Sequence, residues 1–258
     1  MQIGLIGSGN MARALARGWG EPVLCSDAGS GRARALAAEV GGEEMETNLQ
    51  LAQRADLVVL CHKPYQLDQV AHEIAGAAKA VASVVGATSS DRLQAAYPET
   101  PVFALMPNTP VEVRRGVILY AERRPQAWAA PHEPLEPQVL ELFGRLGEIV
   151  RLPEALLPVA AALMSVGPAY QALVAEAQVD AGVRRGLPAA LASRLVVETM
   201  AGTAMLLRER GHDTLAVRRE VTSPGGTTAR GLAALEDRGL RSAFHAAIDA
   251  VLDGGGPP

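Results

Sequence analysis

A glycine-rich motif near the N-terminus constrains the fold of this chain more than any other feature. Residues 7–12 read Gly-Ser-Gly-Asn-Met-Ala, after the apolar run 2–6 and before a helical pattern over 12–19. Gly-x-Gly-x-x-Ala between a strand and a helix is the fingerprint of a dinucleotide-binding βαβ unit. The first glycine makes the tight turn, and the second lets a pyrophosphate approach the backbone. The motif predicts a dinucleotide site, with a purely structural turn as the alternative.

The end of the second predicted strand, 23–26, bears on which dinucleotide is bound. Asp27 lies roughly 20 residues beyond the fingerprint, where an acid normally holds the adenosine ribose, and this favours NAD. Arg32 and Arg34 follow, and either could pair with the 2′-phosphate of NADP. These arginines could equally belong to a solvated helix face. The residues therefore leave NADH and NADPH open.

The first half of the chain alternates short apolar runs with helical patterns, which predicts a mostly parallel, doubly wound α/β sheet. Two loops follow predicted strands, where ligands of such sheets bind. One contains Lys63 and Pro64, and the other holds Asn108 between two prolines; His62, beside the first, is interpreted as a bystander. A surface connection is expected over 123–137, and helices are expected over 67–78 and 138–146. The further predicted strands cover 57–61, 81–86, 102–106, 116–121 and 148–152.

The second half of the chain has no further strand patterns after Pro153. We therefore predict an N-terminal Rossmann-type domain over 1–152 and an all-α domain over 153–258. The predicted helices are Ala/Leu-rich and apolar on several faces, which indicates burial against a second copy. A homodimer through residues 155–252 is expected, with an unusually apolar monomeric bundle as the alternative. These helices are expected over 155–164, 168–185, 188–210, 213–219 and 240–252.

A second glycine-rich stretch, residues 221–228, reads Val-Thr-Ser-Pro-Gly-Gly-Thr-Thr. Ser223 is predicted to be the N-cap of the helix that follows, with Pro224 in its first turn. A helix that opens in this way directs free N–H groups toward an anion such as a carboxylate. The hydroxyls of Thr227 and Thr228 could donate to a neighbouring polar atom. An ordinary capped helix after a Pro-Gly turn, with no ligand, is the alternative.

Composition limits the partners and the compartment. The formal net charge is −4 and no long basic run occurs, so nucleic acid and anionic membranes are not expected as partners. No apolar stretch reaches the ~20 uninterrupted residues of a membrane span. Cys25 and Cys61 are interpreted as buried free thiols in a reducing compartment. With no signal peptide evident, a cytoplasmic protein is expected. No metal-ligand spacing is present.

These motifs, in this order, resemble the pyrroline-5-carboxylate reductase family. The resemblance rests on residues 7–12, on His-Lys-Pro at 62–64, on Met-Pro-Asn-Thr-Pro at 106–110, on Gly-Pro-Ala-Tyr at 167–170 and on Ser-Pro-Gly-Gly-Thr-Thr at 223–228. It implies reduction of 1-pyrroline-5-carboxylate to L-proline with NADPH or NADH, the last step of proline biosynthesis. It also implies a homodimer, often assembled into a decamer, whose partner subunit supplies the 223–228 loop to the substrate.

The site residues expected from the motifs and from the resemblance fall into three groups. Thr228 matches the catalytic threonine position of the family. Ser223, Gly225, Gly226 and Thr227 are expected to hold the substrate. Cofactor binding is expected from Gly7, Gly9, Asn10, Met11, Asp27, Lys63, Pro64 and Asn108. Val166 replaces a small polar residue of the family, which keeps open a related cyclic imine substrate. A β-hydroxyacid reductase and a non-catalytic nucleotide-binding regulator are further alternatives.

Overall fold

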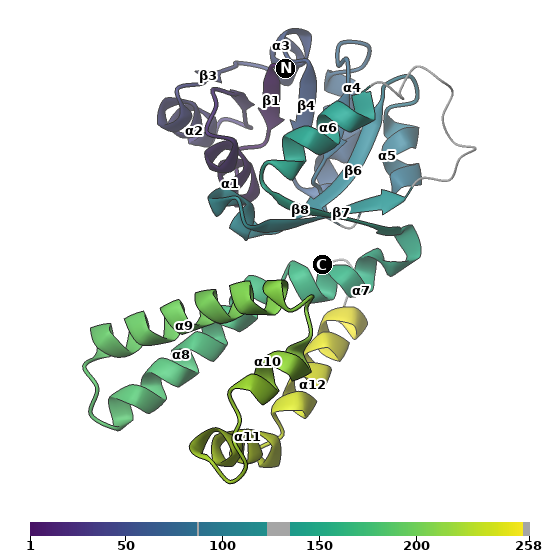
Figure 1. Ribbon diagram of the computed structural model, residues 1–258. Coiled ribbons are helices and arrows are strands. Elements are labelled where there is room, and N and C mark those ends of the chain that lie inside the picture. The colour runs from purple at the N-terminus through teal and green to yellow at the C-terminus, as the bar shows by residue number, and fades with distance from the viewer. Residues whose placement is uncertain (87, 123–134, 255–258) are drawn as a thin grey trace. The chain divides into compact units, whose positions relative to one another are not determined.

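The computed structural model describes residues 1–86, 88–122 and 135–254 (Figure 1). The chain divides into two compact units, Met1–Ser165 and Val166–Pro258. The predicted domain boundary, after residue 152, lies before this division. The difference arises because helix α7 (Leu157–Met164) contacts a strand of the first unit, β7 (Gly116–Glu122). Most of the predicted connection, residues 123–134, lies outside the described residues.

The first unit is built on one eight-stranded sheet with the order β3-β2-β1-β4-β5-β6-β7-β8. All neighbouring strands run parallel except β6 and β7, which pair antiparallel. The prediction of a mostly parallel, doubly wound sheet is confirmed. The remaining strands are β1 (Ile3–Ile6), β2 (Leu24–Ser26), β3 (Glu43–Glu44), β4 (Leu57–Leu60), β5 (Val81–Ser83), β6 (Val102–Pro107) and β8 (Gly147–Pro153).

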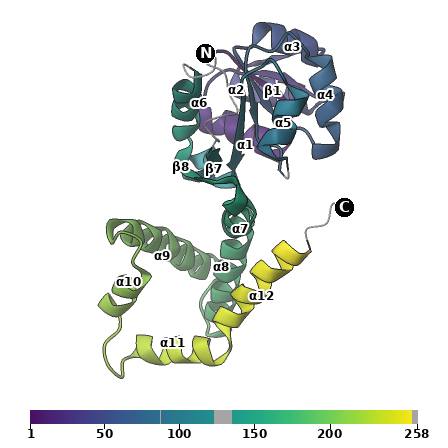
Figure 2. The ribbon, with the colours of Figure 1, turned by 90° about the vertical axis from the view of Figure 1, so that its right-hand side faces the viewer.

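Helices cover both faces of this sheet, as the apolar strands require. Side chains of β4 alternate between two cores: Leu57 and Val59 pack in one, and Val58 and Leu60 in the other. Figure 2 shows α6 and α4 on opposite sides of the sheet. The first core is closed by α1 (Asn10–Trp19), α2 (Arg32–Val40) and α6 (Leu135–Gly144), and the second by α3 (Asn48–Arg54), α4 (Leu67–Glu73) and α5 (Ser90–Ala96).

Two predicted helices have different bounds in the structure. Helix α6 begins at Leu135 rather than at residue 138, because Pro137 fits the first turn, where its missing N–H costs nothing. Helix α4 ends at Glu73 rather than at residue 78, and Gly76 adopts a positive φ of 70° in the turns that follow. Short 3₁₀ helices complete the unit: η1 (Pro64–Gln66), η2 (Thr109–Val113) and η3 (Glu154–Leu156).

The second unit is all-α in its described residues, as predicted. Its helices are α8 (Gly167–Arg184), α9 (Ala189–Glu209), α10 (Thr214–Glu220), α11 (Thr227–Asp237) and α12 (Leu240–Asp253). Helices α8 and α9 pack along each other as a pair (Figure 1). Gly186, with a φ of 97°, turns the chain between them. Asp213 caps α10 by accepting hydrogen bonds from the N–H groups of Leu215 and Ala216.

The second unit buries very little of its apolar surface. Among its described residues, only Ala192 and Val217 are buried apolar side chains. Large exposed apolar side chains include Leu173, Leu191, Leu195, Val197 and Met205 on α8 and α9, and Leu235, Leu240, Phe244 and Leu252 on the last two helices. An exposed surface of this kind marks an interaction site.

Two helical stretches, Glu154–Arg184 and Ala189–Glu209, are long and apolar enough to cross a membrane by length and composition, with mean hydropathy 1.4 and 1.3. The sequence criterion of an uninterrupted apolar run missed them because polar residues are interspersed. The same composition suits helices that a second subunit covers, because obligate interfaces are as apolar as a domain core.

Candidate functional site

The glycine-rich turn after β1 has the shape that a dinucleotide site needs. Gly7 has a φ of 94°, and a Cβ there would lie 2.8 Å from the carbonyl carbon of Cys61 and from the nitrogen of His62. Gly9 differs, since a Cβ there would meet no described atom within 4 Å. Gly7 is therefore required by the fold. Gly9 leaves open space in front of the helix that follows.

The N-terminus of α1 faces this open space with free donors. Gly9 is the N-cap of α1, no described side chain caps the helix, and no acidic residue lies in its first turn. The first N–H groups of an α-helix, here those of Asn10 and Met11, have no acceptor within the helix. Together with the helix dipole they form an anion site. The turn thus fits a pyrophosphate, as the sequence predicted.

Asp27 begins the loop at the end of β2, next to the glycine-rich turn. The carbonyl of Ser26 accepts hydrogen bonds from the N–H of Gly7 (2.9 Å) and from the hydroxyl of Ser8 (3.3 Å). This carbonyl joins the turn to the loop, a link that the sequence analysis missed because it depends on strand pairing. Ser30, three residues after Asp27, was also missed, although the Asp-x-x-Ser spacing is typical of a self-capped turn.

The Lys63–Pro64 loop follows β4, the other neighbour of β1. The N–H of Cys61 donates to the carbonyl of Ile6 (2.8 Å), which places the loop beside the glycine-rich turn. Lys63 donates its N–H to Gln66 Oε1 (3.0 Å), and its side chain is exposed. Burial lowers the pKa of His62, and the Lys63 carbonyl and Glu73 offset only part of that shift. The imidazole is therefore largely neutral at pH 7.

Asn108 is buried at the end of β6, and its amide is engaged within the first unit. Its Oδ1 accepts from the N–H of Val117 (2.9 Å), and its Nδ2 donates to the carbonyl of Met164 (3.1 Å). These bonds tie β6 to β7 and to the end of α7. The loop backbone, rather than the amide, is what this segment can present to a ligand.

The sheet order brings most of the predicted cofactor residues to one edge. Strands β2, β1 and β4 are neighbours, and the chain reverses direction of winding between β1 and β4. Ligands of open α/β sheets bind at this switch point, beyond the carboxyl ends of the strands. The residues that follow these three strands are Gly7, Gly9, Asn10 and Met11 after β1, Asp27 after β2, and Lys63 and Pro64 after β4.

The 223–228 stretch in the second unit is a tight turn followed by a helix. The N–H of Gly226 donates to the carbonyl of Ser223 (3.0 Å), and Gly225 has a φ of 67°. Proline at the second position and glycine with positive φ at the third define a type II turn. The prediction that Ser223 caps the helix and that Pro224 lies in its first turn is wrong. The left-handed conformation of Gly225 cannot continue into a helix, so α11 begins at Thr227 with Gly226 as its N-cap.

The N-terminus of α11 keeps its donors free. No described side chain caps it and its first turn has no acidic residue. Gly226 uses its own N–H in the turn, so the free helix donors are the N–H groups of Thr227 and Thr228, and both side chains are exposed. Arg230 Nη1 donates to the carbonyl of Gly225 (3.0 Å) and holds a positive charge beside the turn. This arrangement suits a small anion.

Other reactive groups do not form a site in the described residues. Cys25 and Cys61 are free thiols, as expected, and burial raises the pKa of both, that of Cys25 to about 12. Protonated thiols of this kind are poor nucleophiles. Among the described residues, no group of three or more His, Cys, Asp or Glu could hold a metal ion.

The sheet, its switch point and the uncapped glycine-rich turn define the first unit as that of a nicotinamide-dinucleotide-dependent oxidoreductase. Residues 2–89 match the family described as NADP oxidoreductase coenzyme F420-dependent, and residues 154–255 match the family described as pyrroline-5-carboxylate reductase dimerisation. The chain belongs to the pyrroline-5-carboxylate reductase family, as its relatives show.

A pyrroline-5-carboxylate reductase of Synechocystis is 34% identical over 264 residues, which cover 97% of this chain and 96% of that protein. The crystal structure of the Streptococcus pyogenes enzyme superposes with a TM-score of 0.86 at 27% identity, over 98% of this chain and 97% of that one. The Plasmodium falciparum enzyme, crystallised with NADP bound, gives 0.84 at 26% identity, over 98% and 96%. The predicted family and fold class are confirmed.

Proposed function

We propose that this chain reduces 1-pyrroline-5-carboxylate to L-proline with NADPH or NADH, the last step of proline biosynthesis. The proposal depends on the turn at 223–226 and on the uncapped start of α11 that follows it. The same chain has a second uncapped, glycine-rich helix start, that of α1, which fits a dinucleotide. The relatives' names and their coverage of the whole chain support the same activity.

The turn would hold the substrate carboxylate. The N–H groups of Thr227 and Thr228 are free to donate, and the helix dipole favours an anion at this end. Gly225 allows the turn, and Gly226 keeps the helix start free of a side chain. Ser223 contributes the carbonyl that closes the turn. The guanidinium of Arg230, held against the turn, adds positive charge for the same carboxylate.

Thr228 would act on the imine nitrogen. Its hydroxyl lies in the first turn of α11 and is exposed, so it can hydrogen-bond the ring nitrogen and orient it or help to protonate it. A protonated imine accepts hydride more readily, because the carbon of the C=N bond is then more electrophilic. When bound, the cofactor supplies the hydride. The protein contributes position, with reacting carbons held at about 3–3.5 Å.

The first unit would bind the cofactor at the switch point of its sheet. Gly9 leaves space for the pyrophosphate, and the N–H groups of Asn10 and Met11 donate to it. Gly7 lets the turn pass against β4. Lys63 and Pro64, and the loop anchored by Asn108, would position the nicotinamide end. Asp27 would shape the adenosine end.

The helical half would form a homodimer through residues 155–252, and a decamer is the larger assembly expected from the resemblance. The exposed apolar side chains of the second unit and the match to the dimerisation family support the dimer. We further propose that the enzyme works in the cytoplasm, where reduced thiols such as Cys25 and Cys61 persist.

The test is the decrease of absorbance at 340 nm with 1-pyrroline-5-carboxylate and each reduced cofactor. Thr228→Ala should lower kcat roughly tenfold or more and leave cofactor affinity nearly unchanged, because the hydroxyl acts at the reacting centre. Thr228→Ser, which keeps the hydroxyl, should retain most of the activity. An unchanged kcat in Thr228→Ala would remove Thr228 from the mechanism, and no turnover by the unaltered protein with either cofactor would reject the proposed function.

A further inference from the structure

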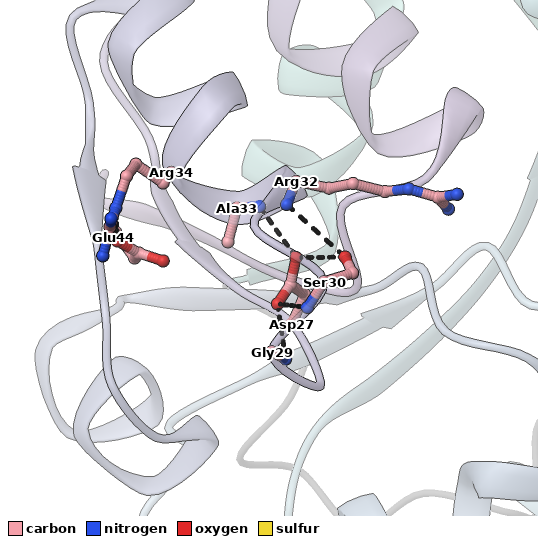
Figure 3. Close-up of polar contacts among 7 residues, drawn as sticks. All are labelled: Asp27, Gly29, Ser30, Arg32, Ala33, Arg34 and Glu44. Carbon is pink, nitrogen blue, oxygen red and sulfur yellow. Dashed lines mark hydrogen bonds and ion pairs between the residues drawn. The ribbon is translucent and has the colours of Figure 1, made fainter.

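The Asp27 carboxylate is fully hydrogen-bonded by its own loop and by the first turn of α2 (Figure 3). Oδ1 accepts hydrogen bonds from the N–H groups of Gly29 (2.7 Å) and Ser30 (3.0 Å). Oδ2 accepts from the hydroxyl of Ser30 (2.7 Å) and from the N–H of Ala33 (2.8 Å). An ionised carboxylate offers about four acceptor positions. All of them are occupied before any ligand arrives.

This engagement changes what the acid can do for a cofactor. An acid at the end of β2 selects NAD by accepting hydrogen bonds from the ribose hydroxyls. For Asp27 to do so, at least one of its four bonds within the loop would have to break. Its negative charge is also offset, because it lies at the start of α2, where the helix dipole and the N–H of Ala33 stabilise an anion.

The pKa of Asp27 reflects the same balance. Burial alone would raise it, but the hydrogen bonds from Ser30, Ala33 and Gly29 outweigh burial, so the pKa is lowered from its usual value. The carboxylate therefore stays ionised and bound to the loop at neutral pH. It holds residues 27–33 in one conformation beside the glycine-rich turn, to which the Ser26 carbonyl connects them.

The two arginines of this segment differ in availability. Arg34 Nε pairs with Glu44 Oε2 at 2.8 Å. Arg32 has an exposed side chain, and no hydrogen bond or ion pair joins its guanidinium to a described residue. The two side chains extend to opposite sides of the loop (Figure 3). Arg32 is the cation left for a ligand, and a guanidinium binds phosphate in a bidentate way.

We propose that Arg32 selects NADPH by pairing with its 2′-phosphate, and that Asp27 is a positioning residue that builds the loop without contacting the ribose. The inference rests on the proposed function, because it concerns the adenosine end of the same cofactor site. In an NAD enzyme the acid at the position of Asp27 contacts the ribose. Here we assign the cofactor contact to Arg32 instead.

Calorimetric binding of two cofactor fragments, 2′,5′-ADP and 5′-AMP, tests this without turnover. The unaltered protein should bind 2′,5′-ADP at least tenfold more tightly than 5′-AMP. Arg32→Ala should lower the affinity for 2′,5′-ADP at least tenfold and leave that for 5′-AMP unchanged. Arg34→Ala is the matched control, and should change neither affinity more than twofold, since Glu44 already holds that side chain.

Asp27→Asn separates positioning from direct contact. It should weaken both fragments by a similar factor, because the loop loses bonds at Oδ2 while the discrimination ratio stays the same. A selective loss of 5′-AMP with tighter 2′,5′-ADP would show a direct ribose contact and overturn the proposal. If this variant does not fold, Arg32→Ala still tests the proposal. An equal loss of affinity for both fragments, or no loss of affinity for either, would overturn it. Failure of the proposed function would instead appear as intact binding without turnover.

Discussion

The two units of this chain use apolar residues in opposite ways. The first closes two cores around its sheet, with Trp19, Phe103 and Phe143 almost completely buried. The second is built from helices as rich in Ala, Leu and Val, yet α8, α11 and α12 contain no buried residue in the single chain. One unit is complete as a monomer. The other requires a partner to bury the surface that its sequence encodes.

The functional residues follow this division. The predicted cofactor residues lie on loops held by the closed core, whereas the predicted substrate turn lies on a unit whose burial depends on association. Folding of the first unit should therefore not depend on protein concentration, while that of the second should. Substitutions confined to one unit should therefore have different consequences from substitutions confined to the other.

Trp19→Ala tests whether the first unit is complete. The indole is 1% exposed, donates from Nε1 to the carbonyl of Leu142 (3.1 Å) and packs edge-on against Phe143. Its removal should lower the free energy of unfolding by about 3–5 kcal/mol. Denaturant unfolding at two protein concentrations should show the same loss. A loss below about 1 kcal/mol would contradict the core described above.

Leu173→Arg tests the second unit. Leu173 is 63% exposed in the single chain, so the change should cost a monomer little. In a dimer, the new arginine would place a charge in the apolar interface from each of the two subunits. The lost apolar burial alone should lower the stability of the dimer by about 3 kcal/mol. Light scattering should show monomers at micromolar concentration. Val113→Arg, at an exposed site of the first unit, is the control and should leave the dimer intact.

Gly7 and Gly9 should respond differently to the same substitution. Gly7→Val places a side chain against the backbone of residues 61 and 62 at a positive φ, and should destabilise the fold by about 1–3 kcal/mol. Gly9→Val enters open space, so thermal stability should be unchanged while cofactor affinity is lost. Thermal melts and cofactor titration separate the two. Equal stability loss in both variants would argue against the open space in front of α1.

His62 should make the smallest contribution, visible as pH dependence. Its folded pKa is lowered, mainly by burial, below an unfolded value of about 6.5. The unfolded state therefore binds the proton first, and the contribution to stability is complete above pH 6.5 and lost as pH falls through the folded pKa. His62→Val should flatten the decline of unfolding free energy between pH 7.5 and 5. If the free energy of unfolding declined equally in the variant and in the unaltered protein, the pH dependence would come from groups other than His62.

The class of the fold could be predicted from local features of the amino-acid sequence. Gly7 and Gly9 indicate the dinucleotide turn. Glycine permits the positive φ at residue 7, and at residue 9 it leaves room for the ligand to approach. Alternating apolar runs determined the sheet, and the absence of strand patterns after Pro153 determined the helical half. These features are local, so a short window of residues carries them completely.

The roles of individual residues depend on contacts that form only in the folded chain. Ser-Pro-Gly at 223–225 fits both a capped helix start and a type II turn. Only the folded chain shows that Gly225 adopts a positive φ, which excludes Ser223 as the helix cap. The position of Asp27 suggested a ribose ligand, but in the folded chain four donors from residues 29–33 hydrogen-bond to its carboxylate. A hydrogen-bond acceptor has a limited number of partners, and only the folded chain shows which ones it has already taken.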